Sequence, residues 1–576
     1  SQIKIRGYRI ELTEIEAVLS NHRFIKSCAV INYSYNDREF LCAYYTSDFT
    51  IQNYELKSYL AKKLPYYMIP SYFIPLQTLP LNVNGKIDRK SLPSPFKNFK
   101  DTKYTKPETK LQKIICQTLE SCLSIKNISI NEDFTNLGMD SLSIIKTQSK
   151  LSALHISVPT QYFYDYSNIR DLCFALENNI SNTENNLSSD IFPFLKHNCD
   201  IIKSNKFFFK TVLITGATGF LGMHLLDILL NKDVTIYCLI RSSSEEKAKK
   251  RLLSMFDFYF KDKYTQDFLF SKIKVFVGDI TYKNLGLSDE QFKSLGKIVD
   301  LVIHCAALVK HIGKYSDFER LNVKGTENIA NFCMKYNIFL NHISTISVSS
   351  DFLPLNNTSD DVYFTEEDFF IGQNYRENYY VRSKLLAEEF LLNNIKNGLL
   401  KANIYRIGNL TARYTDGVFQ YNIDSNAFYN KLQFMLQNKF YFESSIVQDF
   451  DISPVDNVAN AIIGIIYNYG SLNKIFHVFN PHKFNMKSLS EMLNNLGYTI
   501  KLFSDNQFYK KISTLDLSAN SLVISDYNLY TNISYLNIKT NCDITLKYLE
   551  NFNFNYDIID LDYLNKLTKY IENLEK

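Results

Sequence analysis

Tyr380 and Lys384 are two side chains whose types and spacing could transfer a proton. They stand four residues apart in NYYVRSKLLAEEF, so a helix through this stretch places both on one face. A nearby ammonium group stabilises a phenolate and lowers the tyrosine pKa from its usual value of about 10. The spacing therefore predicts that Tyr380 is a proton donor near neutral pH. Tyr379 has no lysine four residues on, and we expect it in the core or in the lining of a pocket.

A second source of polar chemistry is the stretch HISTISV, which has the pattern of a strand. Its hydroxyl groups belong to Ser344, Thr345 and Ser347. A hydroxyl at the end of a strand can donate a hydrogen bond to a carbonyl oxygen that becomes negatively charged during a reaction. The residue types alone do not decide which of the three hydroxyl groups has this role.

A glycine-rich turn, TVLITGATGFLG, predicts a site for a phosphate-containing cofactor. Gly216, Gly219 and Gly222 follow an apolar strand and open a helix. This arrangement lets the backbone approach a pyrophosphate and directs the amide groups of the helix N-terminus at it. The contacts predicted from this turn are Gly216, Thr218, Gly219, Phe220, Leu221 and Gly222.

Two arginines indicate which nicotinamide cofactor is preferred. An acidic residue at the end of the second strand would bind the ribose 2′-hydroxyl of NAD, but Arg241 stands there, with Arg251 in the helix that follows. Two guanidinium groups can bind a 2′-phosphate through paired hydrogen bonds, so the sequence favours NADPH over NADH. For Arg251, a solvated place on a helix surface is an equally good interpretation.

Residues that follow the next strands complete the predicted cofactor site. Asp279 ends VFVGDI, where its carboxylate is placed to bind the adenine amino group. The run HCAALV ends the fourth strand and passes under the cofactor, and Asn322 either forms a link near the ribose or caps a loop. The predicted contacts here are Asp279, Ile280, Ala306, Ala307 and Asn322, together with Tyr380 and Lys384.

Ser141 is a candidate for covalent modification. It stands in DFTNLGMDSLSIIKTQSKL where a loop becomes a helix, with Asp140 as a suitable N-cap. Its hydroxyl would lie exposed at the positive end of the helix, where a phosphodiester is favoured. A capped helix start without modification is the alternative. Leu142, Ile144 and Ile145 would supply apolar faces for packing and for partner docking.

The elements around these residues indicate several domains. Residues 1–95 mix short strands, SCAVINYSY and FLCAYYTS, with a helix around 54–64, and residues 106–180 have helical patterns only. Residues 207–415 alternate strand and helix, which predicts a doubly wound parallel sheet of Rossmann type. The five apolar strands predicted there are KTVLITG, VTIYCLIR, KIKVFVGD, DLVIHCAA and LNHISTISV. Beyond about residue 420 we expect a smaller, mostly helical lid, whose aromatic side chains line a substrate pocket or pack the lid's own core.

Breaks in composition set the expected domain boundaries. Residues 93–107 have no helical or strand period, and residues 181–190 are a polar run typical of a flexible linker. The expected division is an α+β subdomain at 1–98, a four-helix bundle at 106–180, a linker at 181–206 and an α/β domain at 207–576, with a cofactor-binding part at about 207–420 and a substrate-binding part at about 420–576.

Bulk composition disfavours several classes of function. The 576 residues carry a formal net charge of +4, too small to indicate a nucleic acid or membrane partner, and no apolar run reaches the ~20 residues of a membrane helix. The ten cysteines are scattered without metal-binding spacing, which favours reduced core thiols in a cytoplasmic protein and predicts no metal site. The sequence begins within a motif and without Met, so we expect a piece of a longer chain.

Three blocks of the sequence resemble domains of nonribosomal peptide synthetases. SQIKIRGYRIELTEIEAVL and LPLNVNGKIDRKSLP resemble the C-terminal subdomain of adenylation domains, which implies that Lys86 is the adenylation lysine, idle here without the larger adenylation lobe. LGMDSL resembles the attachment motif of peptidyl carrier domains, which implies 4′-phosphopantetheine on Ser141, added by a phosphopantetheinyl transferase. Residues 207–460 resemble the thioester reductase domains of the extended short-chain dehydrogenase/reductase superfamily.

The reductase resemblance implies NADPH as the cofactor and Thr345, Tyr380 and Lys384 as the catalytic residues. Thr345 is chosen over the neighbouring serines because, matched on the following ISV, it falls where the superfamily has its catalytic hydroxyl, and Lys384 would also hold the nicotinamide ribose hydroxyls. The domain order implies that an acyl or peptidyl thioester on Ser141 is reduced through a hemithioacetal to an aldehyde, with further reduction to an alcohol left open. Upstream synthetase domains are the implied partners, and a monomer is the expected state.

Three other interpretations stay open. An aminoadipate-reductase-type enzyme of lysine synthesis has the same domain order. A carrier and docking scaffold with an inactive reductase-like domain is disfavoured by the complete set of Thr345, Tyr380 and Lys384. A sugar epimerase-like activity would prefer NAD and would need no carrier domain, so Arg241 and Ser141 argue against it.

Overall fold

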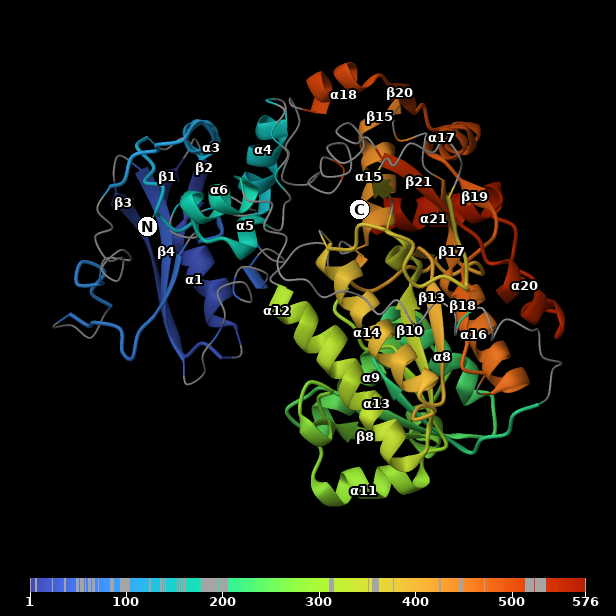
Figure 1. Cartoon of the computed structure of the whole chain (residues 1–576). Coiled ribbons are helices and arrows are strands. Elements are labelled where there is room, and N and C mark those ends of the chain that lie inside the picture. The colour runs from blue at the N-terminus through green and yellow to red at the C-terminus, as the bar shows by residue number, and fades with distance from the viewer. Residues whose placement is uncertain are drawn as a thin grey trace. The chain divides into compact units, whose positions relative to one another are not determined.

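Figure 1 shows the protein as a computed structural model. The structure describes residues 2–574 except 6–7, 23, 36–37, 48–50, 52–55, 57–58, 61–63, 65–67, 71, 83–86, 94–103, 124–125, 135–136, 138, 140, 153, 155, 157, 159–161, 178–194, 196–205, 310–314, 351, 355–361, 377, 424–425, 444, 446–448, 471, 513–522 and 524–534. The chain divides into two compact units, residues 1–107 with 127–138 and residues 108–126 with 139–576. Among the described residues, no helix combines the length and the apolar character needed to span a membrane.

The first unit is built on a three-stranded sheet in the order β3-β4-β5, beside a separate β1-β2 hairpin. Ile15 and Leu19 of helix α1 are fully buried in the same core cluster as Val30 of the sheet. The strands predicted at residues 27–35 and 40–47 are confirmed, whereas the helix predicted at 54–64 lies largely outside the described residues. The elements are β1 (Gln2–Ile5), β2 (Tyr8–Glu11), α1 (Leu12–Ser20), β3 (Ser27–Tyr35), β4 (Arg38–Thr46) and β5 (Tyr72–Pro75).

The regular elements described within residues 108–177 are all helices, as predicted. Helices α3 and α4 pack together, and α3 also contacts α6. Their buried apolar residues include Ile115, Leu119 and Leu172, at the helical spacing that the sequence shows. The helices are α3 (Lys110–Leu123), α4 (Ser141–Ser152), α5 (Tyr162–Asp165) and α6 (Ile169–Glu177).

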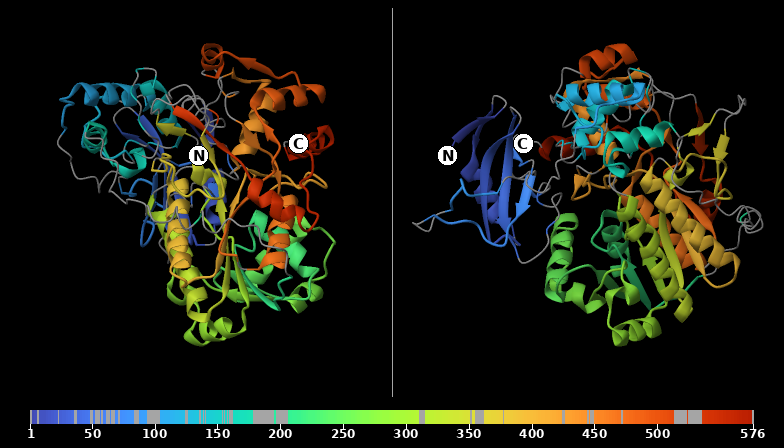
Figure 2. Two further views of the ribbon diagram at one scale, coloured as in Figure 1. Left: turned by 45° about the vertical axis from the view of Figure 1, so that its right-hand side comes forward. Right: turned by 60° about the vertical axis from the view of Figure 1, so that its left-hand side comes forward.

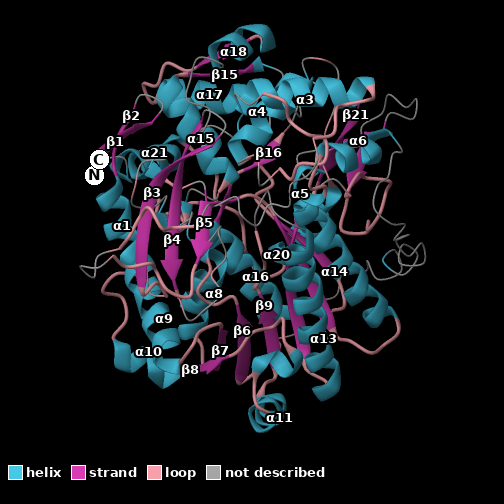
Figure 3. Ribbon diagram, turned by 90° about the vertical axis from the view of Figure 1, so that its left-hand side faces the viewer, coloured by secondary structure: helices cyan, strands magenta, loops and turns pink. Residues whose placement is uncertain are grey.

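The reductase part contains a seven-stranded parallel sheet in the order β18-β13-β10-β9-β6-β7-β8, which confirms the predicted doubly wound fold (Figures 1 and 3). The five strands predicted from apolar runs form β6 to β10. One face of the sheet is covered by α8, α9 and α16, and the other by α11, α13 and α14, because each helix turns an apolar stripe to the sheet. The strands are β6 (Thr211–Thr215), β7 (Thr235–Ile240), β8 (Ile273–Val277), β9 (Leu301–His304), β10 (Phe339–Thr345), β13 (Ala402–Ile407) and β18 (Ile475–Val478).

The strand order reverses direction at β6, which lies between β7 and β9. The carboxyl ends of the parallel strands share one edge of the sheet, and the reversal opens a crevice there, the usual place of a ligand in such folds. The helices around the sheet are α8 (Phe220–Leu230), α9 (Glu245–Tyr259), α10 (Gln266–Lys272), α11 (Asp289–Ile298), α12 (Tyr315–Phe318), α13 (Gly325–Tyr336), α14 (Tyr379–Lys396) and α16 (Val455–Tyr469). A π-helical segment spans Glu319–Lys324, and 3-10 turns span Lys283–Gly286 and Ile346–Ser349.

The elements of the C-terminal region are drawn in orange to red in Figure 2. They have a core of their own that is rich in aromatic side chains. Phe434, Phe440 and Phe508 pack against one another with ring centroids 5.3–6.1 Å apart, so these aromatics pack the lid core. Strand β18 and helix α16 also come from beyond residue 420 but belong to the large sheet and its cover. The remaining elements are β11 (Phe352–Pro354), β12 (Val362–Phe364), β14 (Leu410–Thr411), α15 (Ala427–Asn438), β15 (Phe440–Phe442), β16 (Phe450–Asp451), β17 (Ser453–Pro454), β19 (Lys483–Phe484), α17 (Met486–Asn495), β20 (Lys501–Phe503), α18 (Asp505–Ile512), β21 (Tyr535–Thr540), α20 (Asp543–Glu550) and α21 (Leu561–Leu574).

Candidate active site

The predicted proton-transfer residues meet where strand β10 ends against the start of helix α14. Asn378 caps α14, and its side-chain oxygen accepts hydrogen bonds from the backbone N–H groups of Tyr380 and Val381 at 3.1 and 3.2 Å. This cap fixes the first turn of the helix, so Tyr380 and Lys384 share one face. Strand β10 ends at Thr345, which brings its hydroxyl group to the same place.

Thr345 is the hydroxyl of the HISTISV stretch that faces Tyr380. Its oxygen accepts a hydrogen bond from the backbone of Ser347 at 3.2 Å, and its hydroxyl bonds to the phenol of Tyr380. Ser344 instead donates to the carboxylate of Glu388, and Ser347 is exposed. The surroundings of the three hydroxyls therefore favour Thr345.

Burial sets the acidity of Tyr380. It raises the pKa of Tyr380 to about 12, and the hydrogen bond from Thr345 opposes this effect only in part. The predicted lowering of this pKa is thus wrong in direction. The reason is that burial dominates, while the Lys384 ammonium donates to the backbone oxygen of Ile343 at 2.8 Å. Tyr380 is protonated at neutral pH, the form that a proton donor needs.

Lys384 is buried with only 4% of its surface exposed. Burial lowers the pKa of Lys384 to about 8, while the negative charge of Glu388 acts in the opposite direction. The ammonium form therefore predominates at pH 7 and is lost through the range just above it. A charge that changes so close to neutral pH is typical of functional sites.

Tyr379, the neighbour of Tyr380, lies in the core as predicted. It is 5% exposed and packs edge-on against the rings of Tyr315 and Phe318, at centroid distances of 5.3 and 6.5 Å. This aromatic packing accounts for the position of Tyr379 without a role in proton transfer.

The glycine-rich turn lies at the crevice between β6 and β9. Gly216 has φ +71°, and a Cβ there would lie 2.6 Å from the backbone nitrogen of Ala306. A Cβ on Gly222 would lie 2.3 Å from the oxygen of Gly216. Helix α8 begins at Phe220, directly after Gly219. The missing side chains thus let the turn pack closely against the loop after β9 and lead directly into a helix, an arrangement that fits the pyrophosphate of a dinucleotide.

Arg241 and Arg251 come together beyond the end of β7. Both are exposed, and the pKa of Arg251 is lowered by burial and by the charge of Arg241. Two guanidinium groups that act on each other repel, and an anion bound between them would remove this repulsion. The effect of Arg241 on Arg251 fits the predicted binding of one 2′-phosphate by both side chains.

The other predicted cofactor residues line the same edge. Asp279 follows β8, and its carboxylate accepts a hydrogen bond from the backbone of Thr281 at 2.9 Å. The backbone nitrogen of Ala306 lies 3.4 Å from the hydroxyl of Thr215 in β6. Ala306 and Ala307, which follow β9, are partly exposed at the edge, whereas Ile280 is buried in the core.

Asn322 is a structural link rather than a loop cap. It is 1% exposed, accepts from the backbone of Leu308 at 2.7 Å and donates to the hydroxyl of Ser383 at 2.9 Å. Ser383 in turn donates to the backbone oxygen of Tyr380 at 2.9 Å. Asn322 therefore ties the loop after β9 to the helix that carries Tyr380 and Lys384.

The two predicted residues outside the reductase part are less fully described. Helix α4 begins at Ser141, as predicted for an attachment serine at a helix start, although its side chain lies outside the described residues. Asp140 and Lys86 also lie outside them.

The sequence analysis did not predict Glu388 and Arg406 as site residues. The position of Glu388, four residues after Lys384, was a signal that could have identified it.

Comparison with protein families finds three matches in the order expected. Residues 14–86 match the AMP-binding enzyme C-terminal domain, residues 109–176 match the phosphopantetheine attachment site, and residues 214–462 match the NAD-binding family described as male sterility protein.

Relatives show the same order. The chain is 29% identical over 531 residues to a linear gramicidin synthase of Brevibacillus parabrevis, in a match that covers 89% of this chain and 10% of that protein. It is 25% identical over 597 residues to the L-2-aminoadipate reductase large subunit of Candida glabrata, covering 89% of this chain and 42% of the relative. The chain thus spans less than half the length of each of these relatives.

Solved structures agree with the fold. A thiolation-reductase di-domain from an archaeal non-ribosomal peptide synthetase superposes with a TM-score of 0.67 at 28% identity, over 82% of this chain and 99% of that one. The aureusimine biosynthetic cluster reductase domain superposes with a TM-score of 0.58 at 27% identity, over 69% of this chain and all of that one.

These matches give the class of protein that the chain resembles: it is similar to the reductase-bearing terminal modules of nonribosomal peptide synthetases. More particularly, it carries an adenylation C-terminal subdomain, a phosphopantetheine carrier domain and an NAD(P)H-dependent reductase domain of the extended short-chain dehydrogenase/reductase superfamily, in that order.

Proposed function

We propose that this chain carries an acyl or peptidyl thioester on phosphopantetheinylated Ser141 and releases it by NADPH-dependent reduction to an aldehyde. The observation that carries the proposal is the meeting of Thr345, Tyr380 and Lys384 at the carboxyl edge of a sheet that also bears an open glycine turn. A carrier domain in the same chain supplies the substrate at high effective concentration.

When bound, NADPH would supply hydride to the thioester carbonyl carbon. The protein side chains would stabilise the negative charge that develops and transfer the proton. Thr345 and Tyr380 donate hydrogen bonds to the carbonyl oxygen as it becomes negative. Tyr380 would then transfer its proton to this oxygen, which gives a hemithioacetal, and the ammonium of Lys384 would stabilise the phenolate that remains. When the hemithioacetal collapses, its carbon–sulfur bond breaks and the phenolate takes back the hydroxyl proton as the aldehyde carbonyl forms. The departing thiolate takes up a proton from solvent and becomes the free thiol.

The remaining assignments belong to the same proposal. The glycine turn with Asp279, Ala306 and Ala307 would hold the dinucleotide, and Arg241 with Arg251 would select the 2′-phosphate. The partners would be upstream synthetase domains and a phosphopantetheinyl transferase, with Lys86 idle in this chain and a monomer as the working form. The nine described cysteines are all free, which supports a cytoplasmic location.

The domain limits are proposed as adenylation subdomain 1–98, carrier 106–180, linker 181–206 and reductase 207–576. An aminoadipate-reductase-type function is the second candidate, favoured by the match to the large subunit of that enzyme over 89% of this chain.

The test uses soluble acyl and aminoacyl pantetheine thioesters with NADPH, and follows the absorbance of the reduced nicotinamide. Oxidation of NADPH that is lost in Tyr380→Phe and retained in Tyr379→Phe supports the proposal. A thioester of aminoadipate as the sole substrate accepted would favour the second candidate. A wild-type protein that binds NADPH but oxidises none with any thioester would contradict both.

A further inference from the structure

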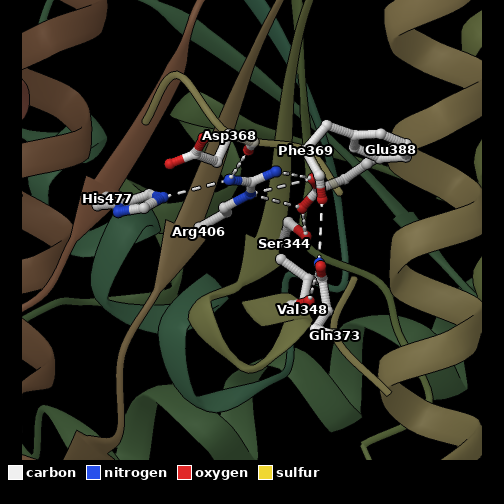
Figure 4. Close-up of polar contacts among 8 residues, drawn as sticks. All are labelled: Ser344, Val348, Asp368, Phe369, Gln373, Glu388, Arg406 and His477. Atoms are coloured by element: carbon white, nitrogen blue, oxygen red, sulfur yellow. Dashed lines mark hydrogen bonds and ion pairs between the residues drawn. The ribbon is translucent and has the colours of Figure 1, made fainter. Parts of the chain in front are cut away.

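A fully buried ion pair, Arg406 with Glu388, joins a strand of the large sheet to the helix that carries Tyr380 and Lys384 (Figure 4). Arg406 of β13 and Glu388 of α14 both have side chains that are 0% exposed, and their closest nitrogen–oxygen distance is 2.7 Å. A second bond runs from Nε of Arg406 to the same carboxylate oxygen at 3.0 Å. The two-point contact orients the carboxylate as well as neutralising it.

The surroundings satisfy the remaining polar atoms of the pair. Arg406 donates to the backbone oxygen of Asp368 at 2.8 Å, and its Nη1 lies 3.3 Å from Nε2 of His477. Ser344 donates its hydroxyl to the second oxygen of Glu388. Buried ion pairs stabilise a fold little more than apolar residues of the same shape would, so packing alone gives no reason for charges here.

The pair lies where strand and helix place the catalytic groups. Three consecutive residues of β10 each contact one residue of a single face of α14. The backbone oxygen of Ile343 accepts from Lys384, Ser344 bonds to Glu388, and Thr345 bonds to Tyr380. Three contacts therefore attach α14 to the end of β10. Two of them involve Lys384 and Tyr380, the proposed proton-transfer residues, and the third involves Glu388.

We propose that Glu388, held by Arg406, is a positioning residue for the reduction, which fixes α14 against the end of β10 and places one negative charge a helical turn from Lys384. This inference rests on the proposed function. In this proposal Glu388 and Arg406 touch neither the substrate nor the cofactor, and they act on the reaction through Lys384.

The other groups around Lys384 do not supply that charge. Cys305 follows β9, and burial raises the pKa of its thiol to about 12, so it is neutral at pH 7. His304 of β9 and His342 of β10 have pKa values held far down by burial and by Lys384 itself, so both are neutral. Tyr380 is neutral as well. Among the described groups that act on Lys384, Glu388 is the one anion.

The experiment measures kcat/KM for NADPH oxidation with a soluble pantetheine thioester between pH 6 and pH 10. Wild-type activity is expected to fall as the pH rises through about 8, where Lys384 loses its proton. In Glu388→Gln the fall should move to lower pH by about one to two units, the effect of removing one charge roughly 6 Å away in a protein interior. The double variant Glu388→Gln/Arg406→Gln leaves no lone guanidinium and should show a smaller shift in the same direction.

Glu366→Gln is the matched control, because Glu366 is a carboxyl only 4% exposed that bonds to Thr545 and does not act on Lys384. Its pH profile should match that of the wild type. Should Glu388→Gln fail to fold because its guanidinium partner is left unpaired, the double variant decides the matter. A wild-type pH profile in a folded Glu388 variant, or an equal shift in Glu366→Gln, overturns the inference. A wild-type protein without thioester-dependent activity overturns the proposed function, and this inference with it.

Discussion

Replacement of Gly216 by alanine tests whether the turn after β6 is built around a bound dinucleotide. Two costs add at this position. The residue has φ +71°, a conformation that costs an L-residue about 1–2 kcal/mol. The new methyl group would also lie 2.6 and 2.7 Å from backbone atoms of Ala306 and Cys305, contacts that flexible side chains cannot relieve, and overpacking of this kind costs a further ~1–3 kcal/mol.

Gly398 provides a matched control in the same chain. Its φ is +70°, but a Cβ there would meet nothing within 4 Å. Gly398→Ala should therefore show only the conformational cost, about 1–2 kcal/mol, while Gly216→Ala should lose about 2–5 kcal/mol of the free energy of unfolding. Relief of the Gly216 contacts requires the loops after β6 and β9 to separate, which moves the predicted pyrophosphate site.

The assay combines thermal unfolding with titration of NADPH by its fluorescence. We expect Gly216→Ala to raise the NADPH Kd at least ~10-fold, since 1.4 kcal/mol of lost interaction corresponds to that factor, and Gly398→Ala to leave it unchanged. Equal losses of stability in the two variants, together with unchanged NADPH affinity in Gly216→Ala, would refute the reasoning.

Three further predictions follow from the site. Arg241→Ala/Arg251→Ala should raise the NADPH Kd by ~10-fold or more while the NADH Kd measured in the same titration stays constant, because charge-assisted bonds contribute about 1.5–3 kcal/mol each; equal losses for both cofactors would contradict the 2′-phosphate assignment. Wild-type kcat should decline above pH about 8, since the pKa of Lys384 is lowered to that value and its charged form is the one below it, and Lys384→Met should abolish the reaction at every pH; a rate that rises above pH 8 would contradict this role. Asn322→Ala should cost about 1–3 kcal/mol in chemical denaturation because the backbone of Leu308 loses its buried partner, and an unchanged midpoint would show that the link is dispensable.

Regular periodicity made the fold of the reductase part predictable. Each of the five apolar runs became a strand of the parallel sheet, and the glycine turn fell at the strand-to-helix junction where such turns bind phosphates. The four-residue spacing of Tyr380 and Lys384 placed them on one helix face, since only local geometry is involved.

The electrostatics of the site could not be obtained from the same spacing. The pKa of Tyr380 is raised because burial outweighs the hydrogen bond from Thr345, and the degree of burial depends on how β10 meets α14. The pairing of Glu388 with Arg406 joins a helix to a strand that follows it in the chain, a contact that one sequence cannot show without its fold. Strand β18 was missed for a similar reason, because it enters the sheet from the region where the strand–helix alternation had faded.

The central claim is that the chain reductively releases its own tethered thioester. The most direct measurement loads Ser141 with an acyl-phosphopantetheine group, adds NADPH in a single turnover, and identifies both the protein-bound arm and the released product by mass spectrometry. The account predicts a free arm thiol, an aldehyde or alcohol product and one or two equivalents of NADPH oxidised, none of which appears in Ser141→Ala or in loaded Tyr380→Phe. Loaded wild-type protein that keeps its acyl group in the presence of NADPH, or that releases it as the carboxylic acid without oxidising NADPH, would contradict the account.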